Sequence, residues 1–123
     1  MEIMHSNNKN IIIILIDALR FDKLKVGGYK YDLTPNLNKI INEGSLIKNH
    51  FANGCPTSVS FPAIFSSTFP LDYNGYNTGI KDRPKSVIEL FKQKGYQTMF
   101  IAGHDISGPI RNYERGAKII KSI

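Results

Sequence analysis

The sequence predicts an α/β fold with a mainly parallel sheet and helices on both faces. Residues 11–16 are a continuous, β-branched apolar run, as in a strand covered on both faces, and residues 96–102 are predicted to be a second buried strand. Segments with helix start and stop residues lie between them, so strands and helices alternate along the chain. A length of 123 residues allows one domain at most, and 41% hydrophobic with 21% charged residues is typical of a globular chain.

The amino-terminal segment is not expected to be a targeting signal. Residues 1–9 form a polar tail, and residues 10–123 are predicted to belong to one α/β domain. The apolar run at 11–16 is shorter than the ~7–15 residues of a signal-peptide core, and it ends in Asp17 rather than at a small-residue cleavage site. It is also far shorter than a membrane span of ~18 residues. We therefore expect a buried strand, no membrane span and, by default, a cytoplasmic protein.

Three helices are expected. The first begins at Pro35, with Thr34 as its N-cap, and stops before Gly44. A short apolar helix is expected around residues 61–67, and a third over residues 86–94, with the serine at its start as the cap. A short strand is also possible over 45–51, and a ragged basic helix over 109–123. The residues expected to face inward from the first and third helices are Leu37, Ile40, Ile41, Val87, Leu90 and Phe91.

Charge and cysteine content limit the classes of partner. The chain has 16 lysines and arginines against 10 aspartates and glutamates, a net charge of +6. This excess suits an anionic substrate or partner, but it forms no long run, so a nucleic-acid-binding tail is not indicated. The single cysteine, Cys55, excludes an intramolecular disulfide framework and a zinc site built from several cysteines.

Asp17 and Arg20 are the first candidates for chemistry. Asp17 follows the first predicted strand directly, and ligands of open α/β sheets bind outside the carboxyl ends of the strands. A carboxylate there can reach a metal ion or a substrate, although an ordinary loop or capping role is equally well supported. Arg20 could pair with Asp17 or meet an anion, but a lone arginine is more often a surface charge.

The segment 54–58 is the second candidate. Its hydroxyl groups are expected just ahead of a helix N-terminus, where backbone N–H groups and the helix dipole favour anions. A hydroxyl held there beside a metal could act as a nucleophile, but a plain capping role for Thr57, Ser58 and Ser60 is the more common one. Cys55 lacks a neighbouring histidine in the sequence that would activate it, so a structural role is favoured. The histidines, at positions 5, 50 and 104, show no metal-ligand spacing.

The order of several motifs resembles a known family. Residues 10–20 (NIIIILIDALR) are followed by residues 34–40 (TPNLNKI) with Glu43-Gly44, then by residues 66–70 (SSTFP), then by residues 95–98 (GYQT) and an apolar strand. This combination resembles the amino-terminal part of the sulfatase family, in the alkaline-phosphatase superfamily, over about residues 10–116. The resemblance implies the alkaline-phosphatase-like α/β fold, here incomplete.

The resemblance also implies a set of site residues. Counting back from the Phe-Pro pair at 69–70 by the family spacing places Thr57 at the nucleophile. Asp17 would bind a divalent metal that Thr57 also contacts. Arg20 would support the catalytic site without contacting the metal itself. The metal would be calcium for a sulfatase, or zinc, manganese or magnesium for a relative that hydrolyses phosphate esters. The substrate would be an anionic sulfate or phosphate ester, and Asp17 and Thr57 are expected to lie close together.

The chain departs from the family pattern in ways that affect this interpretation. Ala18 stands where many sulfatases have a second aspartate, and neither Cys55 nor Thr57 has the proline and arginine spacing of formylglycine maturation. The family's lysine and histidine after the GYxT strand are not reproduced, with His104 near but out of register. An unmodified threonine nucleophile is what the phosphatase and phosphodiesterase relatives use.

The length, far below that of family members, suggests a truncated part of a longer enzyme that is inactive alone and capable of self-association through exposed apolar surface. The alternative from another class is a non-catalytic α/β binding module that has kept the fold and lost the chemistry. A flavodoxin-like or response-regulator domain is a weaker alternative.

Overall fold

The computed structural model describes residues 9–103 and 111–122, and the chain divides into two compact units, residues 1–48 and 49–123. His5 and His104 lie outside the described residues. The prediction of one domain over residues 10–123 contains no signal for a division at residue 48.

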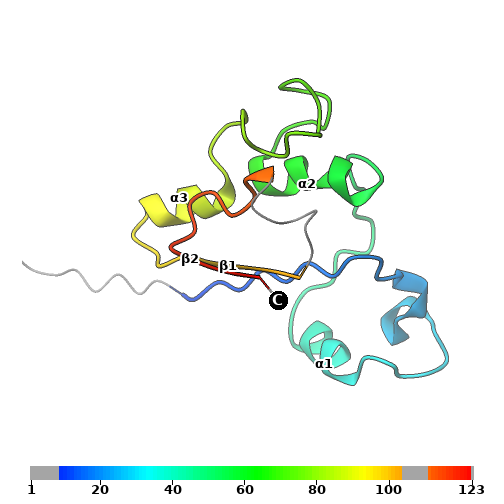
Figure 1. Ribbon diagram of the computed structural model, residues 1–123. Helices are drawn as coiled ribbons and strands as arrows, with labels where there is room; N and C mark the ends of the chain where they lie inside the picture. Colours follow the sequence, from blue (N-terminus) through cyan, green and yellow to red (C-terminus); the bar gives the residue numbers. More distant parts are fainter. Residues whose placement is uncertain (1–8, 104–110, 123) are drawn as a thin grey trace, which may run out of the picture. The chain divides into compact units, whose positions relative to one another are not determined.

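The first unit is built from short helices. It contains the 3-10 helices η1 (Phe21–Lys23) and η2 (Lys25–Gly27) and the helix α1 (Pro35–Glu43), as Figure 1 shows. Leu24, between the two 3-10 helices, is its buried hydrophobic anchor among the described residues. The strand expected over 45–51 does not form.

The bounds of α1 confirm the predicted helix, but not its capping or its buried stripe. Thr34 is the N-cap residue, yet its side chain makes no capping hydrogen bond, so the fixed backbone of Pro35 is the start signal that the structure uses. Leu37 and Ile41 are half-buried, while Ile40 is 64% exposed. The other regular elements of this unit are two single-turn 3-10 helices, which offer too little surface to cover the whole stripe.

The apolar run at 11–16 does not form the predicted buried strand. Its side chains are 47–84% exposed, and the segment carries no strand hydrogen bonding. A strand exists only by pairing with another strand, and the described residues of this unit contain none. The predictions of a strand and of its burial are therefore both wrong for this segment, because the described residues of the unit hold no partner that would order and cover it.

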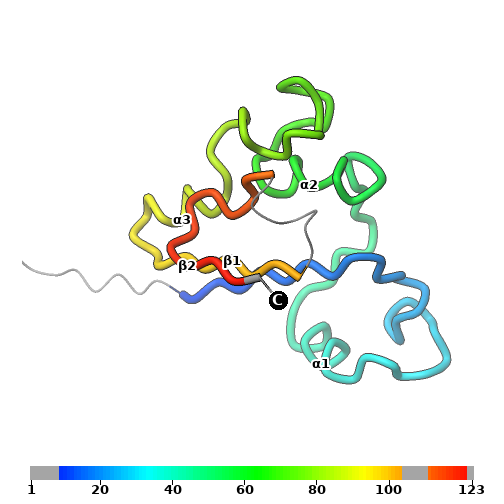
Figure 2. The backbone as a smooth tube through the Cα atoms, in the orientation of Figure 1, coloured from blue at the N-terminus to red at the C-terminus, as the bar shows by residue number. Residues whose placement is uncertain are grey.

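The second unit is a small α/β arrangement. It contains α2 (Thr57–Ser66), α3 (Val87–Gln93), β1 (Met99–Ala102) and β2 (Ile119–Ser122). The two strands pair in parallel, with Met99 opposite Ile119, and the backbone tube in Figure 2 shows them side by side. The parallel pairing agrees with the predicted fold class, whereas the larger sheet and the helices on both of its faces are not present among the described residues.

Two of the element predictions in this unit are wrong in detail. The helix expected around 61–67 begins four residues earlier, at Thr57, and it contains Pro62 in its second turn. Pro62 is fully buried, so packing offsets the cost of the helix hydrogen bond that it cannot donate. Of the basic helix expected over 109–123, the described residues 111–122 form a turn followed by β2, because the β-branched pair Ile119 and Ile120 lies in register with β1.

An aromatic cluster forms the core of the second unit. Phe65, Ile80 and Tyr113 are buried, and Phe61, Ile88 and Phe100 pack against them. The Tyr113 ring lies 5.1 Å from that of Phe65 and 5.3 Å from that of Phe61, measured between centroids. Such tilted and edge-on pairs add to the stabilisation from burial. From α3 the residue that joins the core is Ile88, whereas Leu90, expected to face inward, is 48% exposed.

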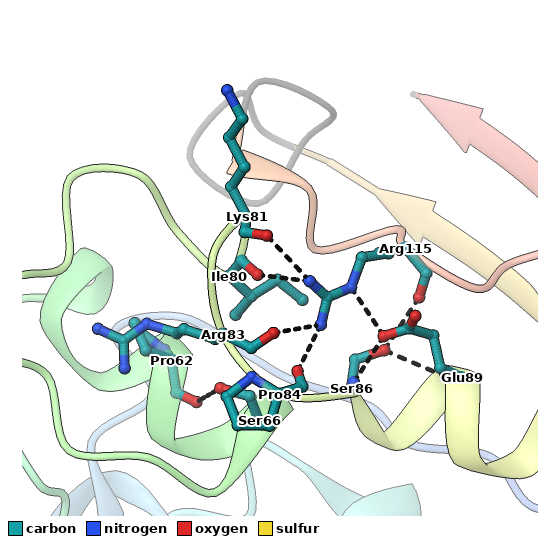
Figure 3. Close-up of polar contacts among 9 residues, drawn as sticks. All are labelled: Pro62, Ser66, Ile80, Lys81, Arg83, Pro84, Ser86, Glu89 and Arg115. Carbon is teal, nitrogen blue, oxygen red and sulfur yellow. Dashed lines mark hydrogen bonds and ion pairs between the residues drawn. The ribbon is translucent and has the colours of Figure 1, made fainter. Parts of the chain in front are cut away.

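Polar side chains fasten α3 to the rest of this unit. Ser86 and Glu89 form a complete capping box at its N-terminus, which confirms Ser86 as the cap. Arg115 donates from Nε to Glu89 Oε2 at 2.7 Å and from its terminal nitrogens to the carbonyls of residues 80, 81, 83 and 84 (Figure 3). The helix start, the 80–84 loop and the turn at 112–116 are thereby joined by one guanidinium.

Candidate functional site

Asp17 lies in a turn that follows the apolar run. Its side chain is exposed, and its Oδ1 accepts a hydrogen bond of 2.9 Å from the backbone N–H of Ala18. Ala18 has a φ of 55°, in the left-handed region that residues with a Cβ rarely adopt. The turn therefore holds the Asp17 carboxylate against the backbone at the end of the run. Aspartate or asparagine would adopt the backbone conformation of position 18 more readily than alanine does.

Arg20 pairs with a residue that the sequence analysis did not single out. Its Nε and Nη2 donate to the two carboxylate oxygens of Asp22, at 2.9 and 2.7 Å. This hydrogen bonding, and the attraction that accompanies it, raises the pKa of Arg20 and lowers the pKa of Asp22. Both side chains are well exposed, so the pair adds little to stability. The opposite charges of Arg20 and Asp22, two positions apart in the sequence, were the signal that could have predicted this pair. The structure shows Arg20 bound to Asp22 and not to Asp17, the partner considered from the sequence.

Thr57 is the first residue of α2, not part of a loop ahead of the helix. The N-cap position is held by Pro56, which has no side-chain acceptor, and the Pro56 carbonyl accepts from the N–H groups of Val59 and Ser60. The Thr57 side chain is therefore carried at the positive end of a ten-residue helix that has no side-chain cap. Thr57 is half-buried, and Ser60 Oγ donates to its carbonyl at 3.1 Å.

The chain packs closely just before this helix. A Cβ added at Gly54 would lie 2.3 Å from Val59 Cγ1, so only glycine allows this approach of the loop to α2. Cys55 follows as an exposed free thiol, two residues before Thr57, and the Cys55–Pro56 peptide bond is cis. The expectation of a buried, structural cysteine is thus wrong, and Cys55 is accessible to reagents.

Two hollows flank α2 in the second unit. The larger, of about 460 Å³, is lined by His50, Phe51, Ala52, Asn53, Ser60, Ala63 and Ile64. The smaller, of about 210 Å³, is lined by Asn53, Ala63, Ser67, Thr68 and Phe69. Thr57 lines neither of them. Asn53 belongs to both, a feature for which the sequence held no signal because asparagine is also common in turns.

The described residues do not fit a complete metal centre. They contain no group of three or more histidine, cysteine, aspartate or glutamate side chains that could share an ion. Calcium takes six to eight oxygen ligands, and Asp17 offers the oxygens of one carboxylate. Asp17 and Thr57 belong to different units, so the expectation that they lie close together stays a prediction.

Comparison with known proteins gives the family. The sulfatase family profile matches residues 9–113. The chain belongs to the sulfatase family. This confirms the resemblance seen in the motifs. The family implies an α/β fold of the alkaline-phosphatase type, and the two-stranded parallel sheet of the second unit is consistent with it.

A human relative, N-acetylgalactosamine-6-sulfatase, is 27% identical over 107 residues. The match takes in 75% of this chain and 20% of the relative, so the chain spans about a fifth of the length of that protein. No solved structure shows a significant match. Across the part of the chain that the structure describes, no helix is both long and apolar enough to cross a membrane.

Proposed function

We propose that this chain contributes the nucleophile and one metal ligand to a metal-dependent hydrolase of sulfuric or phosphoric esters. The observation that carries the proposal is Thr57 at the first position of α2, in a chain that belongs to the sulfatase family. The helix N-terminus attracts the anionic group of such an ester, and the net charge of +6 favours its approach. The relative's name, a sulfatase acting on N-acetylgalactosamine 6-sulfate, supports a sulfate ester.

The chemistry assigned to Thr57 is a displacement at sulfur or phosphorus. Its hydroxyl loses a proton, and a bond forms from Oγ1 to the sulfur or phosphorus atom while the bond to the ester oxygen breaks. That oxygen gains a proton and leaves as an alcohol, and water then releases sulfate or phosphate and restores the hydroxyl. Asp17 would supply one carboxylate ligand to a divalent cation, calcium for a sulfatase or zinc, manganese or magnesium for a phosphate-ester hydrolase. When bound, the cation would lower the pKa of the hydroxyl and balance the charge of the ester.

The other ligands would have to come from outside the described residues. The side chain of Arg20 is held by Asp22, so Arg20 would act on the site through the turn that it helps to fix rather than by contact with Asp17.

The second candidate is a non-catalytic binding module. The absence of a three-ligand cluster among the described residues is the observation that favours it. The family assignment favours the hydrolase instead, because it covers most of the chain, including Asp17, Thr57 and the motifs around them.

The test uses the full-length protein from the natural gene, assayed with nitrophenyl sulfate and nitrophenyl phosphate. We expect Thr57→Ala to lower kcat/KM by about a thousandfold or more, as loss of a covalent nucleophile does. Thr57→Ser keeps a hydroxyl and should retain much of the activity. Asp17→Asn should weaken metal binding, measured by titration into the metal-free protein.

Cys55→Ala is the matched control, because it changes a neighbouring nucleophile while leaving Thr57 in place. Activity lost in Cys55→Ala and kept in Thr57→Ala would show that the register is shifted by two residues. Absence of hydrolysis and of metal binding in the unsubstituted protein would establish the binding module.

A further inference from the structure

The apolar run of residues 11–16 is the longest stretch of exposed apolar side chains in the part of the chain that the structure describes. All six side chains are isoleucine or leucine, and their exposed fractions range from 47 to 84%. Among the described residues, no backbone hydrogen bond joins the run to another segment. Figure 2 shows the run as an extended segment rather than a coiled one. The run therefore presents unpaired strand edges together with an apolar surface.

The exposure of the side chains alternates along the run, as it does in a strand. Each even-numbered residue of the run is more exposed than the odd-numbered apolar residues beside it; Ile12, for example, is 84% exposed against 49% for Ile11 and 61% for Ile13. Such a period of two is that of an extended strand. Pairing with another strand would therefore require little further ordering of the backbone.

Charged residues of opposite sign lie at the two ends of the run. Lys9 lies two positions before it and Asp17 follows it directly, and both side chains are exposed. In a strand these two residues share a face with Ile13, which lies midway between them. Asp17 Oδ1 accepts from the N–H of Ala18, and carboxylate oxygens accept further hydrogen bonds. A strand with this pattern is complementary in charge to an antiparallel copy of itself.

We propose that residues 9–17 pair antiparallel with the same residues of a second copy of this chain. With Ile13 opposite Ile13, Lys9 of each copy lies opposite Asp17 of the other, and the positions from 11 to 15 face apolar side chains. Opposite charges directly across an antiparallel pair stabilise it, whereas like charges destabilise it. A parallel copy in register would place Lys9 beside Lys9 and Asp17 beside Asp17, so the charges favour the antiparallel arrangement. This inference does not rest on the proposed function.

A second copy also offers β1 and β2 as partners, but these strands fit the run less well. Each is four residues long, and β2 carries the exposed Lys121, a residue type that discourages pairing at a strand edge. The run itself contains no charge, proline or glycine over six residues, a composition typical of segments that pair with copies of themselves. A stable interface has about 20–30 residues a side, so a dimer formed by residues 9–17 should be weak and depend on concentration.

Analytical ultracentrifugation of the 123-residue chain, in metal-free buffer over the micromolar range, measures the dimer. Ile13→Lys places two ammonium groups opposite each other and removes an apolar contact from both copies. We expect it to raise the dissociation constant about a hundredfold or more, so that no dimer forms in the same range. Ile40→Lys is the matched control, because Ile40 is 64% exposed in the same unit, against 61% for Ile13. It should dimerise as the unsubstituted chain does.

Exchange of the two terminal charges tests the register. Lys9→Glu alone, or Asp17→Lys alone, should weaken the dimer about tenfold, because each creates two pairs of like charges across the interface. The chain with both substitutions should dimerise within about threefold of the unsubstituted chain. Lys48→Glu changes the net charge as Lys9→Glu does, at an exposed site outside the run, and should have no such effect.

Spin labels on Ile13→Cys or Asn10→Cys, each combined with Cys55→Ser, measure the arrangement by electron paramagnetic resonance. In the antiparallel dimer, labels at position 13 should be in close contact, while those at position 10 lie about 20 Å apart along the strands. Equal short distances at both positions would overturn the proposal in favour of parallel stacking, and distant labels at position 13 would overturn it in favour of another edge. A chain that stays monomeric, equal losses in Ile13→Lys and Ile40→Lys, or no rescue by the double charge exchange would also overturn it.

Discussion

Arg83 offers a sharp test of how the loop after α2 is held. The residue is 5% exposed, and no carboxylate among the described residues forms an ion pair with it. Instead its guanidinium donates to Thr68 Oγ1 and to backbone carbonyls of the loop. These are the carbonyls of Phe69, Pro70, Asp72, Gly75 and Gly79, at 2.8–3.0 Å. The Arg83 side chain thus donates hydrogen bonds to acceptors throughout residues 68–79, a segment that contains no helix or strand.

The cost of Arg83→Met follows from which acceptors water can reach. Phe69 and Asp72 are exposed, so water replaces the lost donor at their carbonyls. Pro70 and Gly79 are buried, and each carbonyl left there without a partner costs about 1–3 kcal/mol. We therefore expect a loss of about 2–6 kcal/mol in the free energy of unfolding of the second unit. Arg83→Lys keeps the charge but has fewer donors in a single ammonium, so about half of this loss is expected.

Urea unfolding followed by circular dichroism measures the global effect, and chymotrypsin cleavage at the aromatic residues of the 68–79 loop measures the local one. Arg83→Met should be cleaved in this loop well before the unsubstituted chain. Arg20→Met is the matched control, because it removes the same charge from an exposed pair, and it should change neither measurement. A stability loss below about 1 kcal/mol without faster loop cleavage would refute the assigned role of Arg83.

Two further predictions concern the same unit. Burial opposes ionisation of Glu89, but hydrogen bonds from the Ser86 N–H and from Arg115 outweigh it and hold the pKa of Glu89 below its ordinary value of 4.5. The stability that Glu89 adds is therefore present above pH 4.5 and lost as the pH falls below it. Glu89→Gln should make the melting temperature fall less steeply below that pH. An equally steep fall in this variant would contradict the stabilising role of the Glu89 carboxylate. Gly79→Ala should lower the free energy of unfolding by about 2 kcal/mol more than Gly75→Ala, measured by thermal unfolding. Both glycines have a positive φ, but only at position 79 would the new Cβ meet backbone, 2.2 Å from the Arg111 carbonyl oxygen. Equal losses in the two variants would disprove this.

Helix boundaries were the part of the fold that the sequence predicted best, because their signals are local. Pro35 and Gly44 mark the ends of α1, and Ser86 with Glu89 three residues later is a complete capping box in both the sequence and the structure. Each of these signals acts through bonds within one helical turn. The start of α2 was misplaced by four residues: a proline is normally tolerated only in the first turn of a helix, whereas Pro62 lies buried in the second turn of α2.

Pairing and side-chain partners were harder to predict because they depend on distant residues. β2 was mistaken for a helix, since its partner β1 lies 20 positions earlier in the register. The roles of Arg83 and Arg115 had no signal at all, because an arginine that binds carbonyls looks the same in the sequence as one exposed to solvent. The candidate site was proposed from motif order rather than from local chemistry. Thr57, expected ahead of a helix, is the first residue of α2 in the structure, and its role as nucleophile stays a prediction.

The run at 11–16 shows what a hydrophobic pattern does and does not determine. Its composition favours a strand more strongly than that of β1, yet β1 is the one that forms, because β1 has β2 beside it and Phe100 packed against Phe65. Apolar, β-branched composition lowers the free energy of burial but supplies no hydrogen-bond partner. The run therefore identifies a segment that needs a neighbouring strand. The metal-binding role proposed for Asp17 depends on such a neighbour, because a run without a partner strand does not hold the carboxylate at the edge of a sheet.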